Sequence, residues 1–268
     1  MLSSQLQQLR SVLRELDRAL IAYSGGVDSA LVAKVAYDVL GDRALAVTAE
    51  SPSLPAEDLE AAKVQAQHIG IAHRIVQTHE LENPSYSTNP VNRCYFCKSE
   101  LYDTLKPLGL DWGYPYVIDG VNADDLQDYR PGIQAAKERG TRSPLAEVGM
   151  TKLEVRALSQ SLGLPWWNKP AQPCLSSRFP YGESITPEKL QQVAQAERYL
   201  KQRGYSILRV RSDGGTARIE LPPQDIPHFL STISRTELVA TFKALGFLYV
   251  TLDLEGFRSG KLNQGLSP

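Results

Sequence analysis

Three cysteines are the residues of this chain whose type and spacing suggest chemistry most directly. Cys94 and Cys97 form the CxxC pair of RCYFCK, and Cys174 follows much later in PCLSSR. A CxxC pair occurs in redox dithiols, in zinc sites and in iron–sulfur sites. Zinc is disfavoured because it needs four ligands and no histidine has a finger-like spacing to Cys174. Buried structural thiols are the simpler alternative, but Arg93 flanks Cys94 and Pro173 precedes Cys174.

Three thiolates are able to hold a [4Fe–4S] cluster in which one iron has no protein ligand. That iron is open to an exogenous sulfide. Sulfide attacks an activated acyl group at neutral pH without a strong general base. An odd number of cysteines in a chain of 268 residues is typical of a reducing compartment, and we expect a cytoplasmic protein.

The segment AYSGGVDS, residues 22–29, is a candidate phosphate site between a predicted strand and a predicted helix. Backbone N–H groups and the helix dipole favour an anion there. Its glycines permit a positive φ and close backbone approach, and its serines supply hydroxyl donors. The loop contains no lysine, so it differs from the Walker loop and suits a leaving pyrophosphate. A simple strand-to-helix turn is the alternative. The predicted cofactor-binding residues are Ala22, Ser24, Gly25, Gly26, Val27, Asp28 and Ser29.

A second polar segment, DGVNADD at 119–125, follows another predicted strand. Gly120 would allow close approach, and Asn122, Asp124 and Asp125 would offer polar ligands at the carboxyl edge of the sheet, where open α/β sheets bind ligands. A helix N-cap with acidic residues in the first turn would explain the two aspartates without any function.

Strand and helix patterns alternate from about residue 19 to residue 165. This alternation predicts an α/β fold with a doubly wound, mostly parallel sheet. The predicted strands are 19–23, 44–48, 73–77 and 116–119, and the predicted helices include 28–40 and 56–70.

A proline-rich segment separates this pattern from a smaller α+β pattern. We expect domains at 1–165 and 183–268, joined by a cysteine-bearing linker at 166–182. The smaller domain is expected to contain helices at 187–203 and 227–245 and strands at 206–211, 217–221 and 248–254.

The charge composition argues against several partners. The formal net charge is −1, so no basic excess favours nucleic acid or acidic lipid. No apolar run approaches the ~18 residues that a membrane span needs, and the polar N-terminus has no signal-peptide pattern.

SGGVDS resembles the signature of the PP-loop ATP pyrophosphatase superfamily, whose members adenylylate an oxygen and release pyrophosphate. Residues 1–265 as a whole resemble the LarE family of nickel-pincer nucleotide sulfur transferases. The resemblance rests on AYSGGVDSALVAK, CYFCK, DGVNADDLQDYRPG, PLAEVGMTKLEVR and PCLSSRFPYG. It implies that ATP adenylylates each carboxylate of pyridinium-3,5-biscarboxylic acid mononucleotide and that sulfur then replaces AMP, giving the bis-thiocarboxylate.

The resemblance also implies roles for single residues. Asp28 would lie near Mg²⁺ and pyrophosphate. The end of a predicted strand, residues 48–50 and beginning with Thr48, would lie near the ribose or adenine. Cys174 matches the cysteine that some members sacrifice as a sulfur donor, ending as dehydroalanine. The added Cys94 and Cys97 resemble members with a [4Fe–4S] cluster, in which Cys174 would be a ligand. A homo-oligomer such as a hexamer is implied as well.

The nucleotide substrate carries a phosphate, for which the smaller domain offers arginines. Arg209 and Arg211 are two positions apart on a predicted strand and so share one face. Guanidinium groups suit phosphate recognition, and Ser177 and Arg178 would complete the pocket. Glu220 would orient the arginines or contact a metal, although a surface pair of Arg211 with Glu220 is the alternative.

Two other functions stay open from the sequence. Some PP-loop tRNA thiolases also combine this loop with CxxC and a third cysteine, although tRNA binding usually needs a basic surface. An ATP-binding sensor with redox cysteines is the alternative without catalysis.

Overall fold

The computed structural model describes residues 2–127, 130–170, 173–258 and 261–262. Within these ranges the chain forms two compact units. The first contains residues 1–86 and 92–172, and the second contains 87–91 and 173–268. The change of unit at 172/173 falls inside the segment expected to be a linker, of which residues 171–172 lie outside the described ranges.

A parallel sheet is the centre of the first unit. In the described part of the chain it has four strands in the order β3-β2-β1-β4. The strands are β1 (Ala19–Ala22), β2 (Ala44–Glu50), β3 (Ala72–Gln77) and β4 (Tyr116–Ile118). β1 pairs in parallel with both β2 and β4, so the chain crosses from one half of the sheet to the other beside β1. Ligands of open α/β sheets bind at such a point, outside the carboxyl ends of the strands.

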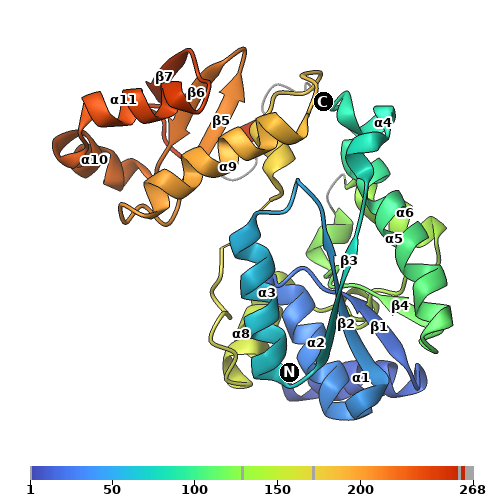
Figure 1. Ribbon diagram of the computed structural model, residues 1–268. Helices are drawn as coiled ribbons and strands as arrows, with labels where there is room; N and C mark the ends of the chain where they lie inside the picture. Colours follow the sequence, from blue (N-terminus) through green and yellow to red (C-terminus); the bar gives the residue numbers. More distant parts are fainter. Residues whose placement is uncertain (1, 128–129, 171–172, 259–260, 263–268) are drawn as a thin grey trace. The chain divides into compact units, whose positions relative to one another are not determined.

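Helices cover both faces of this sheet (Figure 1). Successive strand residues point to opposite faces, so Ile21 packs in the core with α1, α2, α3 and α8, whereas Leu20 packs with α5 and α6. The fold class predicted from the sequence is therefore confirmed. The helices are α1 (Leu2–Glu15), α2 (Val27–Leu40), α3 (Ala56–Ile69), α4 (Pro84–Ser87), α5 (Arg93–Asp111), α6 (Pro131–Glu138), α7 (Pro144–Glu147) and α8 (Lys152–Ser161).

α5 has no counterpart among the helices expected from the sequence, which left residues 78–115 without a prediction. It runs through Pro107 and buries Tyr102 and Leu105 against the sheet. A proline usually interrupts a helix because it removes one backbone hydrogen bond, and here apolar packing on either side outweighs that cost.

The second unit combines helices with a small mixed sheet of order β5-β6-β7 in its described residues. β5 (Arg209–Asp213) and β6 (Thr216–Glu220) form an antiparallel hairpin, and β7 (Tyr249–Leu252) runs parallel to β6. The helices are α9 (Pro187–Lys201), α10 (Ile226–Thr232) and α11 (Arg235–Ala244). The single helix expected at 227–245 is thus two helices. Ser234 separates them because its side chain accepts a hydrogen bond from the Glu237 N–H and begins α11.

Residues 87–91 are part of the second unit although they lie far from its other residues in sequence. Buried Asn89 has a φ of +56°, and its side-chain amide donates to the Pro180 carbonyl at 2.7 Å. Backbone N–H groups of Gly182 and Ile185 donate to Asn89 and Ser87. These bonds explain why a boundary drawn from composition alone misses this segment.

Among the described residues, no helix combines the length and the apolar character needed to cross a membrane.

Candidate active site

The phosphate loop joins β1 to α2, as expected, and its serines hold it in shape. The hydroxyls of Ser24 and Ser29 lie 3.1 Å apart, and the Ser29 hydroxyl donates to the Gly26 carbonyl at 3.2 Å. The Gly26 N–H donates to the Ser24 hydroxyl at 3.3 Å. Ala22 ends β1, and Val27 begins α2.

Only the first glycine of the loop needs a conformation that other residues avoid. Gly25 has a φ of +67°, and a Cβ atom there would lie 3.0 Å from the Cβ of Ala62 on α3. Gly26 caps α2 with a φ of −77°. The expectation of a positive φ is therefore met at Gly25 and not at Gly26, because only Gly25 turns the chain against α3.

The DGVNADD segment lies against the phosphate loop. The Asn122 side-chain amide donates to a carboxylate oxygen of Asp28 at 2.9 Å, across 94 positions of sequence. Asn122 is fully buried and is held by Asp125, since the backbone N–H of each residue donates to the side chain of the other. Asp124 accepts a hydrogen bond from the Lys152 N–H at 2.8 Å. Asp124 thus contacts the first turn of α8.

Gly120 explains how closely the two segments approach. A Cβ atom at this position would lie 2.6 Å from the Ser29 nitrogen and 2.9 Å from the Ser29 Cα. Real Cβ atoms do not come this close to backbone, and the backbone at the start of α2 has little freedom to retreat.

Gly120→Ala is therefore expected to destabilise the protein by about 1–3 kcal/mol, the usual cost of overpacking, and to weaken ATP binding. Urea unfolding and nucleotide titration measure the two effects. Gly132→Ala is the comparison variant, since its added Cβ would approach a side-chain atom, the Lys98 Cγ at 2.9 Å, and comes no closer than 3.4 Å to backbone. Equal stability of the two variants would contradict this role of Gly120.

Burial raises the pKa of Asp28, and the nearby charge of Asp125 acts in the same direction. The hydrogen bond from Asn122 and the positive charge of Lys152 oppose this effect without cancelling it. Because burial makes this carboxylate costly to ionise, it gains most when a cation binds beside it.

The end of β2 places Thr48 next to the phosphate loop. Its hydroxyl donates to the Tyr23 carbonyl at 2.7 Å and lies 2.8 Å from the His73 Nε2. Because the hydroxyl proton is committed to Tyr23, the imidazole is the donor in the second bond. Thr48 is 2% exposed, and its hydrogen bond holds Tyr23, the second residue of the 22–29 segment. Glu50 at the strand end accepts a hydrogen bond from Gln77.

A lysine from distant sequence reaches the phosphate loop. The Lys169 ammonium donates to the Gly25 carbonyl at 3.3 Å and lies 3.5 Å from a carboxylate oxygen of Asp58 on α3. Sequence reasoning missed this residue because it searched the loop itself for a cation. The available signal was that Lys169 is the only basic residue between Arg156 and Arg178.

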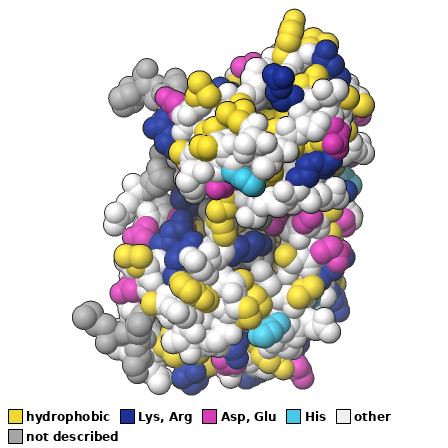
Figure 2. Space-filling view, turned by 90° about the vertical axis from the view of Figure 1, so that its left-hand side faces the viewer, with side chains coloured by type: hydrophobic (Ala, Val, Ile, Leu, Met, Phe, Trp, Pro, Cys, Tyr) yellow, Lys and Arg dark blue, Asp and Glu magenta, His cyan; other side chains and the backbone are white. Residues whose placement is uncertain are grey.

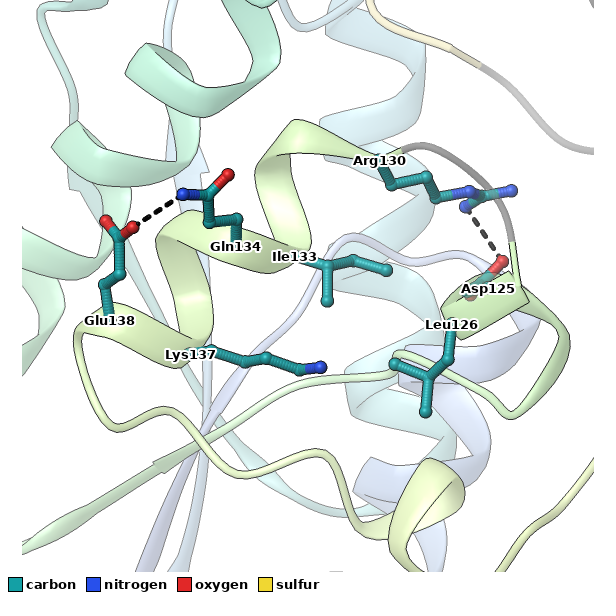
Figure 3. Close-up of a pocket in the computed structure, with 7 residues that line it drawn as sticks. All are labelled: Asp125, Leu126, Arg130, Ile133, Gln134, Lys137 and Glu138. Carbon is teal, nitrogen blue, oxygen red and sulfur yellow. Dashed lines mark hydrogen bonds and ion pairs between the residues drawn. The ribbon is translucent and has the colours of Figure 1, made fainter.

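A cavity of about 310 Å³ opens beside Asp125, between the segment after β4 and helix α6. Its described lining residues are Asp125, Leu126, Arg130, Ile133, Gln134, Lys137 and Glu138. An ion pair of Arg130 with Asp125 at 2.8 Å lies at one end, and a hydrogen bond from Gln134 to Glu138 lies at the other (Figure 3). None of these residues belongs to the phosphate loop. The cavity adjoins the predicted site through Asp125, which is hydrogen-bonded to Asn122.

The CxxC pair lies in the first unit and Cys174 in the second. Cys94 and Cys97 occupy the first turns of α5, so their side chains share one helix face. All three cysteines are at least partly exposed, and none of them forms a disulfide. The described residues contain no group of three His, Cys, Asp or Glu side chains arranged to hold a metal ion.

Hydrogen bonds from Arg178 and Ser177 hold the backbone of Cys174. Arg178 donates to the carbonyl oxygens of Pro173 and Cys174 at 2.7 and 3.1 Å, and the Ser177 hydroxyl donates to the Cys174 carbonyl at 2.8 Å. The remaining Arg178 nitrogens donate to both carboxylate oxygens of Glu197 on α9, and both side chains are 3% exposed. The structure thus gives Arg178 a role in fixing the cysteine loop, which sequence reasoning did not include.

Arg209 and Arg211 lie on β5, as expected, and are near Arg178. The Arg211 Nε donates to Glu220 at 2.6 Å, and its Nη1 donates to the Ser177 carbonyl at 3.0 Å. The pair of Arg211 with Glu220 exists, but it is buried rather than on the surface. Burial and the charge of Arg178 lower the pKa of Arg209 to about 10. Three guanidinium groups so close together favour an anion.

Comparisons with known proteins show the family of the chain. A protein-family model described as NAD synthase matches residues 3–89. An uncharacterized protein of Synechocystis is 69% identical over 267 residues, which cover 100% of both chains. Pyridinium-3,5-bisthiocarboxylic acid mononucleotide synthase of Lactiplantibacillus plantarum, a LarE protein, is 40% identical over 99% of this chain and 96% of its own. The chain belongs to the LarE family.

A more distant relative of this LarE protein is the glutamine-hydrolysing GMP synthase of Thermoplasma acidophilum. One subunit of that enzyme is 28% identical over 77% of this chain and 71% of its own length. The NAD synthase match covers the phosphate loop and the first three strands. Family and fold together identify the chain as an ATP-dependent enzyme of the PP-loop superfamily.

Proposed function

We propose that this LarE protein transfers sulfur to the carboxylates of pyridinium-3,5-biscarboxylic acid mononucleotide, a step in the synthesis of a nickel-pincer cofactor. The observation that carries the proposal is the full-length similarity to the L. plantarum synthase. The hydrogen bond between Asn122 of the DGVNADD segment and Asp28 of the phosphate loop supports it. The name of that relative supplies the substrate class, and the site supplies the chemistry of ATP activation.

Two bond exchanges make up each round. A carboxylate oxygen of the substrate forms a bond to the α-phosphorus of ATP, and the bond from that phosphorus to the bridging oxygen breaks, releasing pyrophosphate. A sulfur nucleophile then bonds to the acyl carbon, the bond to the AMP oxygen breaks, and AMP leaves. The phosphate loop at the start of α2 would hold the departing pyrophosphate, since its N–H groups and the helix dipole favour an anion.

Asp28 fits a Mg²⁺ site beside that pyrophosphate. Carboxylate and phosphate oxygens are the ligands that Mg²⁺ prefers. Burial raises the pKa of Asp28, and a bound cation would stabilise its ionised form. When bound, Mg²⁺ would neutralise charge on the phosphates. Asn122 would fix the direction in which Asp28 points.

Two sources of sulfur are compatible with the three cysteines. Cys174 would either give up its own sulfur or bind a [4Fe–4S] cluster together with Cys94 and Cys97. Thiolates are the usual ligands of such a cluster, and two of the three cysteines share one face of α5. A bound cluster would supply an iron site for an exogenous sulfide. We favour the cluster because a sacrificial donor needs no CxxC pair.

The arginines of the second unit are proposed to receive the substrate phosphate. Arg209 and Arg211 carry the positive charge, and the Ser177 hydroxyl, which donates to the Cys174 carbonyl, would turn toward the phosphate to bind it. Because Arg178 is hydrogen-bonded to Glu197 and to the cysteine loop, we propose that it supports this anion site by holding the turn that carries Ser177. We also propose that the chain acts as a homo-oligomer.

The proposal is tested by incubating the protein anaerobically with ATP, Mg²⁺, sulfide and the dicarboxylate nucleotide. Pyrophosphate release that depends on the nucleotide, with a substrate mass that rises as sulfur replaces oxygen, is the expected result. Reconstitution with iron and sulfide, followed by absorbance and electron paramagnetic resonance, separates the two sulfur sources. A protein that becomes lighter by one H₂S after turnover would instead identify Cys174 as the donor. Binding of ATP with no pyrophosphate release would contradict the proposal.

A tRNA thiolase is the alternative, and the surface gives it little support. On the face drawn in Figure 2, Lys and Arg side chains lie among acidic and hydrophobic side chains and do not form one basic stripe. The formal net charge of −1 agrees with this distribution. A salt-dependent mobility shift with tRNA would favour the alternative.

A further inference from the structure

We propose that Lys169 is the cation of the phosphate loop and binds the β- and γ-phosphates of ATP. The inference deepens the proposed function, because it rests on the use of ATP and names the residue that grips the leaving group. Residues 22–29 contain one acidic side chain, Asp28, and no basic one. A loop of this kind needs positive charge from elsewhere to balance a triphosphate.

The position of Lys169 meets this need. Its ammonium lies 3.3 Å from the carbonyl of Gly25, the loop residue with the positive φ. A phosphate held by the N–H groups at the start of α2 would lie next to the loop and within reach of a flexible lysine side chain. Gly25 and Lys169 belong to the same compact unit, so this approach is a feature of one part of the fold.

The backbone that carries Lys169 is fixed. Arg156 on α8 donates to the Lys169 carbonyl at 3.0 Å, to the Trp167 carbonyl at 3.3 Å and to the Asn168 side chain at 3.1 Å. Trp166, just before this segment, packs edge-on against His68 of α3 with ring centroids 5.3 Å apart. The helices α3 and α8, beside the loop, therefore position the backbone of this lysine.

The contacts of the ammonium are weak enough to exchange. Asp58 lies 3.5 Å away, beyond an ordinary hydrogen bond, and the carbonyl of Gly25 is a neutral acceptor. An ammonium has three N–H donors, and within the described ranges this one has these two partners. With 19% of its side chain exposed, Lys169 is sheltered from water, so an incoming phosphate would replace a poor set of contacts with a charge-assisted hydrogen bond.

The competing explanation is that Lys169 only holds the loop in place through its contacts with Gly25 and Asp58. The affinities of three ligands distinguish this structural role from phosphate binding. Affinities are measured with the full-length protein and Mg²⁺ for α,β-methylene-ATP, which blocks adenylylation, for pyrophosphate and for AMP. Lys169→Met is expected to weaken binding of the first two at least about tenfold, the usual cost of losing a hydrogen bond to a charged group, while AMP binding changes less than about twofold. Lys63→Met, which removes an exposed lysine from α3, is the matched control.

Lys169→Gln is the second variant, and it tests the same inference if Lys169→Met folds poorly. Glutamine is able to donate to the Gly25 carbonyl but carries no charge, so the structural role would survive this change and a phosphate contact would not. Lys169→Arg should retain most of the affinity. Unchanged affinity for α,β-methylene-ATP in the glutamine variant, or equal losses for AMP and for the triphosphate, would overturn the inference. None of these measurements needs the pyridinium substrate, so they are independent of the proposed sulfur transfer.

Discussion

Cys174→Ala is expected to abolish sulfur transfer while substrate-dependent pyrophosphate release continues. Both proposed sulfur sources require this thiol, either as the donor or as a ligand. The loop should keep its shape, because Arg178 and Ser177 hold the Cys174 backbone carbonyl and not its side chain. The phosphate loop and Asp28 are untouched. Mass spectrometry of the product and a pyrophosphate assay measure the two half-reactions separately.

The two CxxC variants decide how Cys174 acts. If a cluster is needed, Cys94→Ala and Cys97→Ala should lose sulfur transfer as completely as Cys174→Ala. If Cys174 is sacrificed, both variants should retain a single turnover. Continued formation of thiocarboxylate by Cys174→Ala would refute both routes.

Asp28→Asn is expected to lower the rate of pyrophosphate release by at least about 100-fold, a loss typical of removing one preorganised charged group from an active site. Sulfur transfer should fall by the same factor, because it depends on the acyl-adenylate. Asn122 is able to donate to the new amide oxygen, so the fold is retained. Asp38→Asn, on the exposed side of the same helix, is the control and should leave both rates unchanged.

The same substitution should stabilise the protein when no nucleotide is bound. Burial raises the pKa of Asp28 in the folded state, so the folded protein holds this proton more tightly than the unfolded chain does. Stability is therefore lost as the pH rises through the raised pKa, and Asp28→Asn avoids that loss. Its Tm should exceed that of the unsubstituted protein at neutral pH, and the gap should close below the ordinary pKa of 3.8. A lower Tm at neutral pH would contradict this assignment.

Much of the first unit is predictable from local patterns. Gly41 and Gly70 end α2 and α3 close to where the periodicity predicts, because a glycine at a helix end is a short-range signal. α5 was missed because its apolar residues are fewer and Pro107 usually argues against a helix. The split between α10 and α11 depends on one capping serine inside an otherwise helical pattern.

The active site shows a similar division. The phosphate loop and DGVNADD were found because each follows a strand and has a distinctive composition, and their contact follows from the strand order. Lys169 and the bond between Arg178 and Glu197 were not found, since they depend on contacts between distant segments that composition does not encode. Gly120 was expected to make room for a ligand, and in the structure it makes room for the backbone of Ser29.

The position of β1 between β2 and β4 has a consequence for how this enzyme acquires activity during synthesis. The strands that carry the phosphate loop and its partner Asn122 leave the ribosome far apart in time, with α5 made between them. A nascent chain that ends before β4 has the loop but not the residue that orients Asp28. Protection of the chain against proteolysis by nucleotide should therefore appear only once both the loop and Asn122 are in place, so this protection would report that the first unit has finished folding.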